Sequence, residues 1–285
     1  MAKILCVGIA TLDIVNEVVA YPEEDDEIRI LAQEKRRGGN AANTAVILSQ
    51  LGHECYWAGT LVKESDCQII LDDFDDYQIN TDYAQFLVSG KVPTSYISIS
   101  RETASRTISH FRDCPEYCFS EFKKINLQAF EWLHFEGRNI EHTYKMMCYA
   151  KQNYPKLPIS VELEKPRKGI EQLIEAADII IFSKHYALAH NFYSAFEFLQ
   201  QFKQYSNDKV VVCAWGSSGA AALFKQQNNW QDAVQVKAVD TLAAGDVFNA
   251  AIIDQQIKQN NISLSLKAAC QLAAEKCTIK GLRLV

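Results

Sequence analysis

Short apolar, strand-like segments alternate with helical patterns along most of this chain, and this alternation limits the fold more than any other feature. Strand-like runs lie at 4–10, 55–59, 132–135, 159–163, 179–182 and 210–214, and helical patterns at 40–51, 67–77, 141–152, 170–176 and 191–202. Several runs are continuously apolar, as expected for strands buried on both faces of a parallel sheet. The pattern predicts an α/β domain over residues 1–285, with a mostly parallel central sheet between two layers of helices.

Two segments, 14–36 and 94–111, depart from this rhythm. They contain period-two alternation, for example at 96–100 and 106–110, without an intervening helical pattern. Alternation of this kind is typical of half-buried antiparallel strands. We therefore expect a small separate β-sheet that covers the main sheet as a lid.

Composition and charge exclude several classes of protein. The formal net charge is −6, which gives no electrostatic footprint for nucleic acid or an anionic membrane surface. The nine cysteines are an odd number without a Cys-x-x-Cys pair, so reduced thiols are expected. No uncharged run is long enough to cross a bilayer. We expect a cytoplasmic protein with no nucleic-acid or membrane partner.

The stretch Asp-Thr-Leu-Ala-Ala-Gly-Asp at 240–246 runs directly into an apolar segment of helical length. Small residues at a helix start leave the backbone N–H groups of Ala243, Ala244 and Gly245 open to an anion such as phosphate. Asp246 falls in the first helical turn. Its carboxylate would either accept a proton from an attacking hydroxyl or simply cap the helix, and the local sequence leaves both interpretations open.

Polar residues follow five of the predicted strands. Asp13 comes after the first, Glu136 and Glu164 after the third and fourth, Lys184 after the fifth, and Trp215 to Gly219 after the sixth. Each alone is compatible with solvated surface. Parallel strands place their carboxyl ends on one edge, where ligands bind, so the coincidence favours a site there.

A second helix start lies at Arg-Gly-Gly-Asn-Ala-Ala-Asn, residues 37–43. Asn40 is the expected N-cap, and Asn43 lies three residues further on. Together with the backbone of Gly38 and Gly39, the two amides offer mixed donors and acceptors to a polyol, although an ordinary capped helix is an equally simple interpretation. The chain contains neither a Gly-x-Gly-x-x-Gly fingerprint after a strand nor a Walker-type phosphate loop.

The two helix starts, roughly two hundred residues apart and in this order, resemble those of the ribokinase (PfkB) family of small-molecule kinases. Within that family the ketohexose kinases, which act on fructose, are the most similar. Further segments that carry the resemblance are 4–8, 21–29, 136–139, 161–167, 183–184, 212–215 and 239–242. The likeness covers essentially the whole chain. It implies a ribokinase-like three-layer sandwich that transfers phosphate from ATP to a ketohexose, most simply to the 1-hydroxyl of fructose.

The resemblance also implies roles for individual residues. Asp246 would be the general base, and Ala243, Ala244 and Gly245 the anion hole. The sugar would be bound by Asp13, Gly38, Gly39, Asn40 and Asn43, with Arg106 close to sugar or phosphate and Asp25 reaching the sugar of the partner in a lid-mediated homodimer. Glu136, Glu164 and Lys184 would line the nucleotide and metal side, with Trp215, Gly216, Gly219 and Cys277 around adenine. The implied cofactors are ATP and Mg²⁺, with a K⁺ ion beside residues 240–246.

The sequence departs from the family pattern at several positions. Ala243 replaces a glycine, which is harmless at ordinary backbone angles and obstructive at positive φ or against a phosphate. Ser217 and Ser218 stand where the ketohexose kinases have acidic residues, and the Asn-x-x-Glu motif is not evident at 183–186. No metal-ligand set is predicted. A kinase for another sugar or a nucleoside, such as ribose or adenosine, and a catalytically impaired regulator that only binds sugar and nucleotide remain alternatives.

Overall fold

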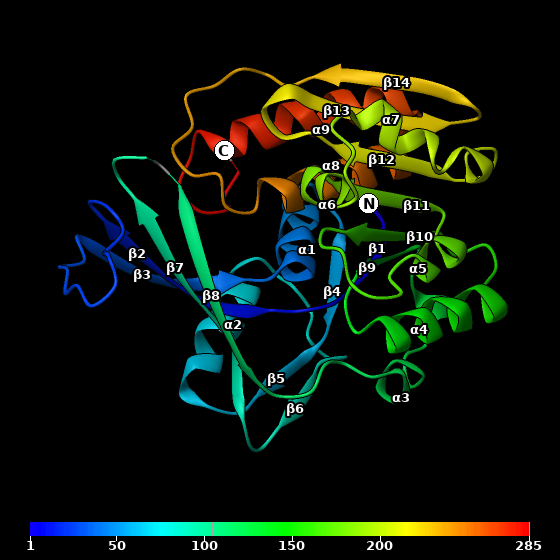
Figure 1. The fold of residues 1–285 in the computed structure, drawn as a ribbon. Helices are drawn as coiled ribbons and strands as arrows, with labels where there is room; N and C mark the ends of the chain where they lie inside the picture. The colour runs from blue at the N-terminus through cyan, green and yellow to red at the C-terminus, as the bar shows by residue number, and fades with distance from the viewer. Residues whose placement is uncertain (104, 285) are drawn as a thin grey trace.

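The computed structural model describes residues 1–103 and 105–284, and its centre is an eight-stranded sheet in the order β14, β13, β12, β11, β10, β9, β1, β4 (Figure 1). The strands are β1 (Lys3–Val7), β4 (Glu54–Ala58), β9 (Trp132–Glu136), β10 (Ile159–Leu163), β11 (Ile179–Ser183), β12 (Val210–Ala214), β13 (Gly219–Phe224) and β14 (Gln227–Asp232). The six strands from β12 to β4 are parallel, and β13 and β14 are added antiparallel at one edge.

Both faces of the sheet are covered by helices. One face packs against α1 (Asn40–Gln50), α2 (Ser65–Asp76), α8 (Ala244–Gln259) and α9 (Ile262–Cys277). The other packs against α3 (Phe119–Phe122), α4 (Ile140–Asn153), α5 (Gln172–Ala176), α6 (Lys184–Ala189) and α7 (Ala195–Gln200), with 3-10 turns η1 (Leu127–Ala129), η2 (Lys203–Tyr205) and η3 (Gly216–Ser218) between elements. The expected three-layer α/β architecture is therefore confirmed.

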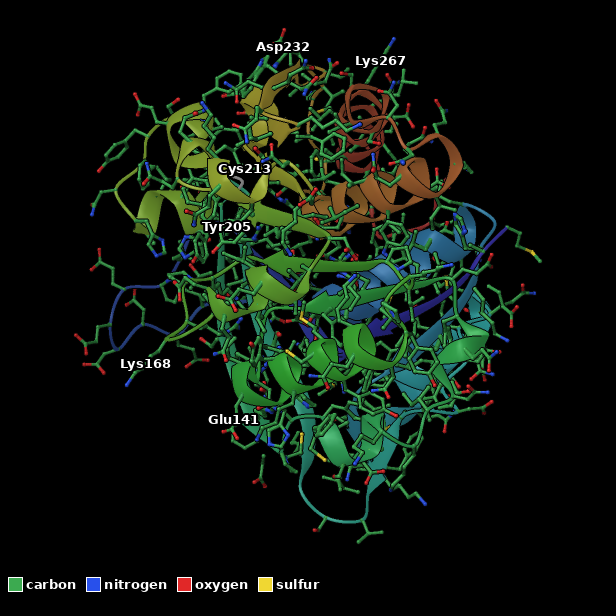
Figure 2. The ribbon with its side chains drawn as sticks, turned by 90° about the vertical axis from the view of Figure 1, so that its right-hand side faces the viewer. Glu141, Lys168, Tyr205, Cys213, Asp232 and Lys267 are labelled. Atoms are coloured by element: carbon green, nitrogen blue, oxygen red, sulfur yellow. The ribbon has the colours of Figure 1, made fainter. Side chains whose placement is uncertain are left out.

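Alternation along the strands explains why both faces are covered. Ile4 and Cys6 of β1 enter one hydrophobic core, whereas Leu5 and Val7 enter the other. Successive strand side chains point to opposite faces, so a continuously apolar strand needs a helical layer on each side. In Figure 2, Cys213 of β12 lies inside the molecule, while Glu141 of α4 and Lys267 of α9 mark the outer surfaces of the two helical layers.

A second, four-stranded sheet projects from the main one, in the order β3 (Ala32–Gly38), β2 (Thr11–Val18), β7 (Lys91–Ser100), β8 (Arg106–Asp113). Its outer pairs are antiparallel, but the central β2 and β7 pair in parallel. A short parallel pair, β5 (Thr60–Val62) and β6 (Gln85–Leu87), lies near its base (Figure 1). The segments 14–36 and 94–111 supply strands of this sheet, as the alternation predicts.

The sequence prediction missed some elements and misplaced others. β1 ends at Val7, so Asp13 lies on β2 of the second sheet and does not follow the first strand directly. The helix expected at 191–202 occupies only 195–200. β14 has the sequence Gln-Asn-Asn-Trp-Gln-Asp and is mostly exposed, so no apolar pattern marks it. None of the helices in the described part of the chain is long and apolar enough to cross a membrane.

Candidate active site

The start of α8 is an open helix N-terminus at the carboxyl-end edge of the main sheet. Ala243 is its N-cap residue and adopts left-handed angles, with φ 62° and ψ 10°. A Cβ placed on Gly245 would meet no heavy atom of the described residues within 4 Å. Gly245 is exposed and uncrowded at the first turn of the helix, so the local geometry there suits an anion.

Asp246, in the first turn of α8, is only 6% exposed, and its Oδ2 accepts a hydrogen bond of 2.6 Å from Nδ2 of Asn43. The side chain is thus engaged by α1 and does not cap its own helix. Burial raises the pKa of the Asp246 carboxyl well above its ordinary value, and the nearby Glu162 adds to the rise. A desolvated carboxylate with a raised pKa is a competent proton acceptor.

The start of α1 faces the start of α8. Gly39 is its N-cap residue, with φ 100°, and a Cβ there would lie 2.3 Å from the backbone oxygen of Ile9. Asn40 was expected to cap the helix; instead it is the first helical residue, and its Nδ2 donates to Oε2 of Glu162 at 3.0 Å and of Glu164 at 3.2 Å. That prediction was wrong because the tight Gly38–Gly39 turn moves the cap one residue earlier.

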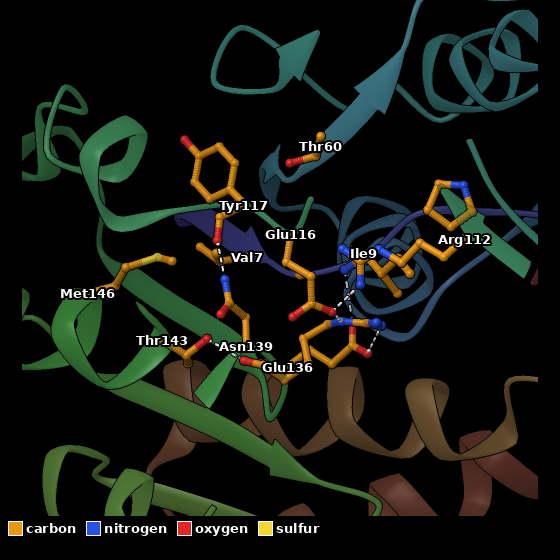
Figure 3. A pocket seen from close by; sticks show the side chains of 13 residues that line it. Val7, Ile9, Thr60, Arg112, Glu116, Tyr117, Glu136, Asn139, Thr143 and Met146 are labelled. Atoms are coloured by element: carbon orange, nitrogen blue, oxygen red, sulfur yellow. Dashed lines mark hydrogen bonds and ion pairs between the residues drawn. The ribbon is translucent and has the colours of Figure 1, made fainter. Parts of the chain in front are cut away.

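Glu136 and Glu162 lie side by side at the ends of β9 and β10, where they are register partners. Glu136 lines the pocket of Figure 3. Its Oε2 accepts the N–H of Ile9 at 3.0 Å, and its Oε1 accepts Nη1 of Arg138 at 3.0 Å. Burial, together with the charges of Glu164 and Glu136, raises the pKa of Glu162 to about 8. The edge of the sheet therefore carries a compact group of buried carboxyls.

Asp13 and Arg106 come to this edge from the second sheet. Oδ1 of Asp13 accepts the Thr11 hydroxyl at 2.7 Å, and a Cβ on Gly38 would approach Oδ2 of Asp13 to 2.1 Å. Gly38 therefore leaves room for the Asp13 carboxylate. Arg106, the first residue of β8, donates from Nη1 to the Thr241 hydroxyl at 2.9 Å, which joins the second sheet to the loop before α8.

The loop that precedes α8 is fixed by Asp240 and the end of α9. Oδ1 of Asp240 accepts the Leu242 N–H at 2.9 Å, and Nζ of the buried Lys276 lies 2.8 Å from its carbonyl oxygen and 3.2 Å from Oδ2. Burial opposes ionisation of Asp240, but the Leu242 N–H, Lys276 and Arg36 outweigh it and lower the pKa. The Cys277 carbonyl accepts the N–H of Asp240 at 3.2 Å. Lys276 thus already binds Asp240 oxygens at the place where the K⁺ ion was expected.

Lys184 and Trp215 meet at the next two strand ends. Lys184 begins α6, and its Nζ lies 5.5 Å from the centre of the Trp215 ring. The Trp215 side chain is buried in the hydrophobic core, so the surface beside it is formed by the backbone of Gly216 to Gly219. Gly219 has φ 130°, and a Cβ there would lie 2.1 Å from the Gln231 oxygen.

Asp25 is the one predicted site residue that lies away from this edge. It occupies the exposed loop between β2 and β3, which lies at the far end of the second sheet from α8 (Figure 1). Asp25 has positive φ, 67°, as a turn residue does. Within one chain it is therefore not placed with Asp246 and Asn43.

No preformed metal cage is evident: within residues 1–103 and 105–284, no three His, Cys, Asp or Glu side chains are grouped to hold an ion. Mg²⁺ in phosphoryl-transfer enzymes is held by one or two carboxylates together with substrate phosphates. The carboxyls of the buried Glu162 and the partly exposed Glu164, beside the open helix start, are compatible with that mode of binding.

The model of the pfkB family carbohydrate kinases matches residues 1–284. Ketohexokinase from Mus musculus is 36% identical, over 98% of this chain and 97% of the mouse protein. The chain belongs to the PfkB family of carbohydrate kinases. It is also similar to a nucleoside kinase from Methanocaldococcus jannaschii, at 26% identity over 90% of this chain and 84% of that protein.

Solved structures give the same fold assignment for this PfkB kinase. Ribokinase from Giardia lamblia superposes with a TM-score of 0.86 over 99% of this chain and 96% of that chain, at 16% identity. Arabidopsis thaliana ribokinase, complexed with ribose and ATP, gives 0.82 over 98% and 94%, at 18% identity. The ribokinase-like fold is therefore established, and the family match together with the 36% identity to a ketohexokinase assigns the chain as a sugar kinase.

Two buried residues of the site were not selected from the sequence. Glu162 interrupts the apolar strand β10, and a carboxylate inside a buried strand was the available signal. Arg37 stands in the run Gln-Glu-Lys-Arg-Arg, where charge alone does not distinguish it from its exposed neighbours. The structure places Arg37 in direct contact with Asn43.

Proposed function

We propose that this PfkB kinase transfers the γ-phosphate of ATP to a ketohexose, most simply to the 1-hydroxyl of fructose, giving fructose 1-phosphate. The observation that carries the proposal is the buried Asp246 carboxylate at the open start of α8. This arrangement provides a proton acceptor for the sugar hydroxyl next to backbone donors for the transferring phosphoryl group. Phosphoryl transfer depends on such positioning and electrostatic stabilisation.

The choice of a ketohexose is supported by the 36% identity with mouse ketohexokinase over nearly the full length of both proteins. The 26% identity with a nucleoside kinase supports the alternative acceptors, ribose and nucleosides, less strongly. In the proposed complex the sugar lies between the two helix starts. Asp13, Gly39, Asn40 and Asn43 contact its hydroxyls, and Asp246 faces the hydroxyl that is phosphorylated.

ATP is the proposed phosphate donor, with its adenine between the Gly216–Gly219 turn and the end of α9 near Cys277. Mg²⁺ bound to the phosphates would neutralise charge that develops during transfer. Glu136, Glu164 and Lys184 are proposed to line that side. The second sheet, with Arg106 already bonded to Thr241, would act as a lid that excludes water from the sugar.

A homodimer through the second sheet is proposed because apolar side chains are exposed on it. Tyr96 of β7 and Phe111 of β8 are exposed and share one face of the sheet in the β7–β8 register, and Ile28 and Ile30 of the β2–β3 loop are exposed too. Exposed apolar groups in one area are typical of interaction surfaces. A partner in this position would bring its Asp25 toward the sugar site, which would explain why Asp25 lies far from Asp246 of its own chain.

The experiment is a substrate panel with purified protein, ATP and Mg²⁺, in which release of ADP is measured with fructose, ribose, adenosine or no acceptor. We expect ADP release above background with fructose, and phosphorus NMR of the product should place phosphate on the 1-oxygen. Asp246→Asn is the matched control and should abolish the signal. If only ribose or adenosine supports turnover, that compound is the acceptor and the ketohexose proposal is wrong. If no acceptor supports turnover, the proposed kinase activity is refuted.

The second candidate, a regulator that binds sugar and nucleotide without turnover, is supported by Ala243. Its φ of 62° is a conformation that a residue with a Cβ adopts at a cost of about 1–2 kcal/mol. Calorimetry that detects sugar and ATP binding in a protein without product, even at high enzyme concentration, would favour this candidate. If Ala243→Gly then gained turnover, the alanine would be identified as the cause.

A further inference from the structure

Arg37 is a fully buried arginine beside the proposed general base, and its position calls for a function. Its side chain is 1% exposed, although arginine is almost never buried without partners. Nε donates to Oδ2 of Asp73 on α2 at 2.5 Å, and Nη1 donates to Oδ1 of Asn43 at 2.7 Å. The guanidinium also lies over the Phe74 ring, 5.4 Å from its centre. Arg37 is thus fixed on three sides.

The contact with Arg37 decides which way the Asn43 amide points. A guanidinium can only donate hydrogen bonds, so the atom of Asn43 that faces it must be the amide oxygen. The amide NH₂ then faces Asp246, where it donates to Oδ2 at 2.6 Å. An amide turned the other way would place oxygen against oxygen at Asp246 and would leave Arg37 facing a donor.

This orientation favours the ionised form of Asp246. The hydrogen bond from Asn43 lowers the pKa of that carboxyl, whereas its burial and the charge of Glu162 raise it. The hydrogen bond that Asn43 donates stabilises the ionised carboxylate of Asp246, and only the ionised form can accept a proton from the sugar. Loss of the Arg37 contact would free the amide to rotate and would weaken this donor.

We infer that Arg37 is a positioning residue for phosphoryl transfer, which holds the Asn43 amide in the orientation that activates Asp246. Asp73, on the opposite side, holds the guanidinium in place. The chain Asp73, Arg37, Asn43, Asp246 links α2, the end of β3, α1 and α8 by consecutive side-chain contacts. Arg37 acts through Asn43 and touches no reacting atom. The inference rests on the proposed function, in which Asp246 is the base.

The first test is a double-mutant cycle on kcat/KM for the sugar, with Arg37→Met, Asn43→Ala and the combined variant. Each single change should lower kcat/KM by about tenfold or more. The combined variant should lose little more than Asn43→Ala alone, because Arg37 acts only through the Asn43 amide that this variant already lacks. Lys35→Met is the matched control, since Lys35 is an exposed cation on the same strand, and it should stay within about twofold of wild type. Additive losses would refute the inference.

The second test is the pH profile, which a merely structural role would not move. In Arg37→Met the acidic limb of kcat/KM should shift to higher pH, and the rate deficit should shrink as pH rises, because Asp246 becomes harder to ionise. Carbon-13 NMR of the Asp246 carboxyl should report the same shift without any turnover. An unmoved limb and an unmoved carboxyl titration, with equal losses at all pH values, would overturn the inference.

Arg37→Lys keeps the positive charge beside Asp73 and provides a variant if Arg37→Met fails to fold. A lysine lacks the two-pronged geometry of the guanidinium, so the acidic limb should again move upward, by less than in Arg37→Met. A wild-type limb in Arg37→Lys would count against the inference. The two proposals fail in different ways. Wild-type turnover in Asp246→Asn would refute Asp246 as the general base. Loss of turnover in Asp246→Asn, combined with an unchanged acidic limb of the pH profile in the Arg37 variants, would refute only the role of Arg37.

Discussion

The two helix starts at the edge of the sheet look alike in sequence but differ in what surrounds their glycines. At α1, added Cβ atoms on Gly38 and Gly39 would collide with the Asp13 carboxylate and the Ile9 backbone. At α8, a Cβ on Gly245 would meet none of the described atoms within 4 Å. The glycines of α1 serve the packing of the protein itself, whereas Gly245 keeps a space open beside the helix N-terminus. The proposed phosphoryl group would occupy that space.

The largest effect is expected for Asp246, the residue on which the two helix starts converge. Asp246→Asn should lower kcat by about 10²–10⁴-fold, the range for loss of a general base, with the fold unchanged. Steady-state kinetics alongside circular dichroism would measure this. A loss of less than tenfold would mean that the α8 start binds phosphate without supplying the base. Both helix starts would then serve only to bind ligands.

Exchanging glycine for alanine at each helix start tests the contrast directly. Gly39→Ala should lower the free energy of unfolding by on the order of 3 kcal/mol, because the Ile9 backbone cannot move away and φ is positive. Gly245→Ala should leave thermal unfolding nearly unchanged and lower kcat/KM for ATP by about tenfold, since the methyl group would enter the space left for phosphate. Equal thermal shifts in the two variants would remove the distinction.

The buried Asp246 also predicts how stability depends on pH. Its pKa is raised in the folded state, so the folded protein binds more protons than the unfolded chain, and stability should fall as pH rises from about 4 through the raised pKa. Asp246→Asn removes this dependence, and its stability relative to wild type should grow with pH by up to on the order of 1 kcal/mol per unit. Urea unfolding at several pH values measures it; parallel curves for the two proteins would contradict the raised pKa.

The smallest effect is expected at Ala243, where the α8 start departs from the glycine-rich pattern. Ala243→Gly relieves the left-handed strain but makes the unfolded chain more flexible, and these effects oppose each other. The free energy of unfolding should change by less than about 1 kcal/mol, in the direction of stabilisation. Denaturant titration of both proteins would check this. A clear destabilisation would show that the alanine methyl group makes contacts that outweigh the strain.

Some strands could be predicted from the sequence, and others could not. The buried strands β10 and β12 were placed with their observed bounds, because strands buried on both faces are rich in branched apolar residues, even where Ser160 and Glu162 interrupt β10. The polar edge strand β14 and the parallel pairing of β2 with β7 were not foreseen. Exposed strands carry no apolar signal, and the direction of pairing within a small sheet depends on how the chain returns between its strands.

The same division applies to the site. Asp246, Asn43 and Asn40 were selected because helix starts with small residues have a local signature, whereas the capping role assigned to Asn40 was wrong. The contacts of Glu162 and the burial of Arg37 became visible only in three dimensions, since they depend on residues distant in sequence. The roles of all these residues in catalysis and binding remain predictions for the experiments above.

The sequence by itself determined the α/β layering and the two helix starts, because periodicity and turn chemistry are local properties that tertiary contacts only reinforce. The tertiary structure decided which side chains meet: Asn43 with Asp246 across about two hundred residues, and Arg37 with Asn43 across the Gly38–Gly39 turn. It also decided that Ala243 is left-handed and that Gly245 borders open space. The physical reason is that burial, pKa and hydrogen-bond direction depend on neighbours, which the fold alone brings together.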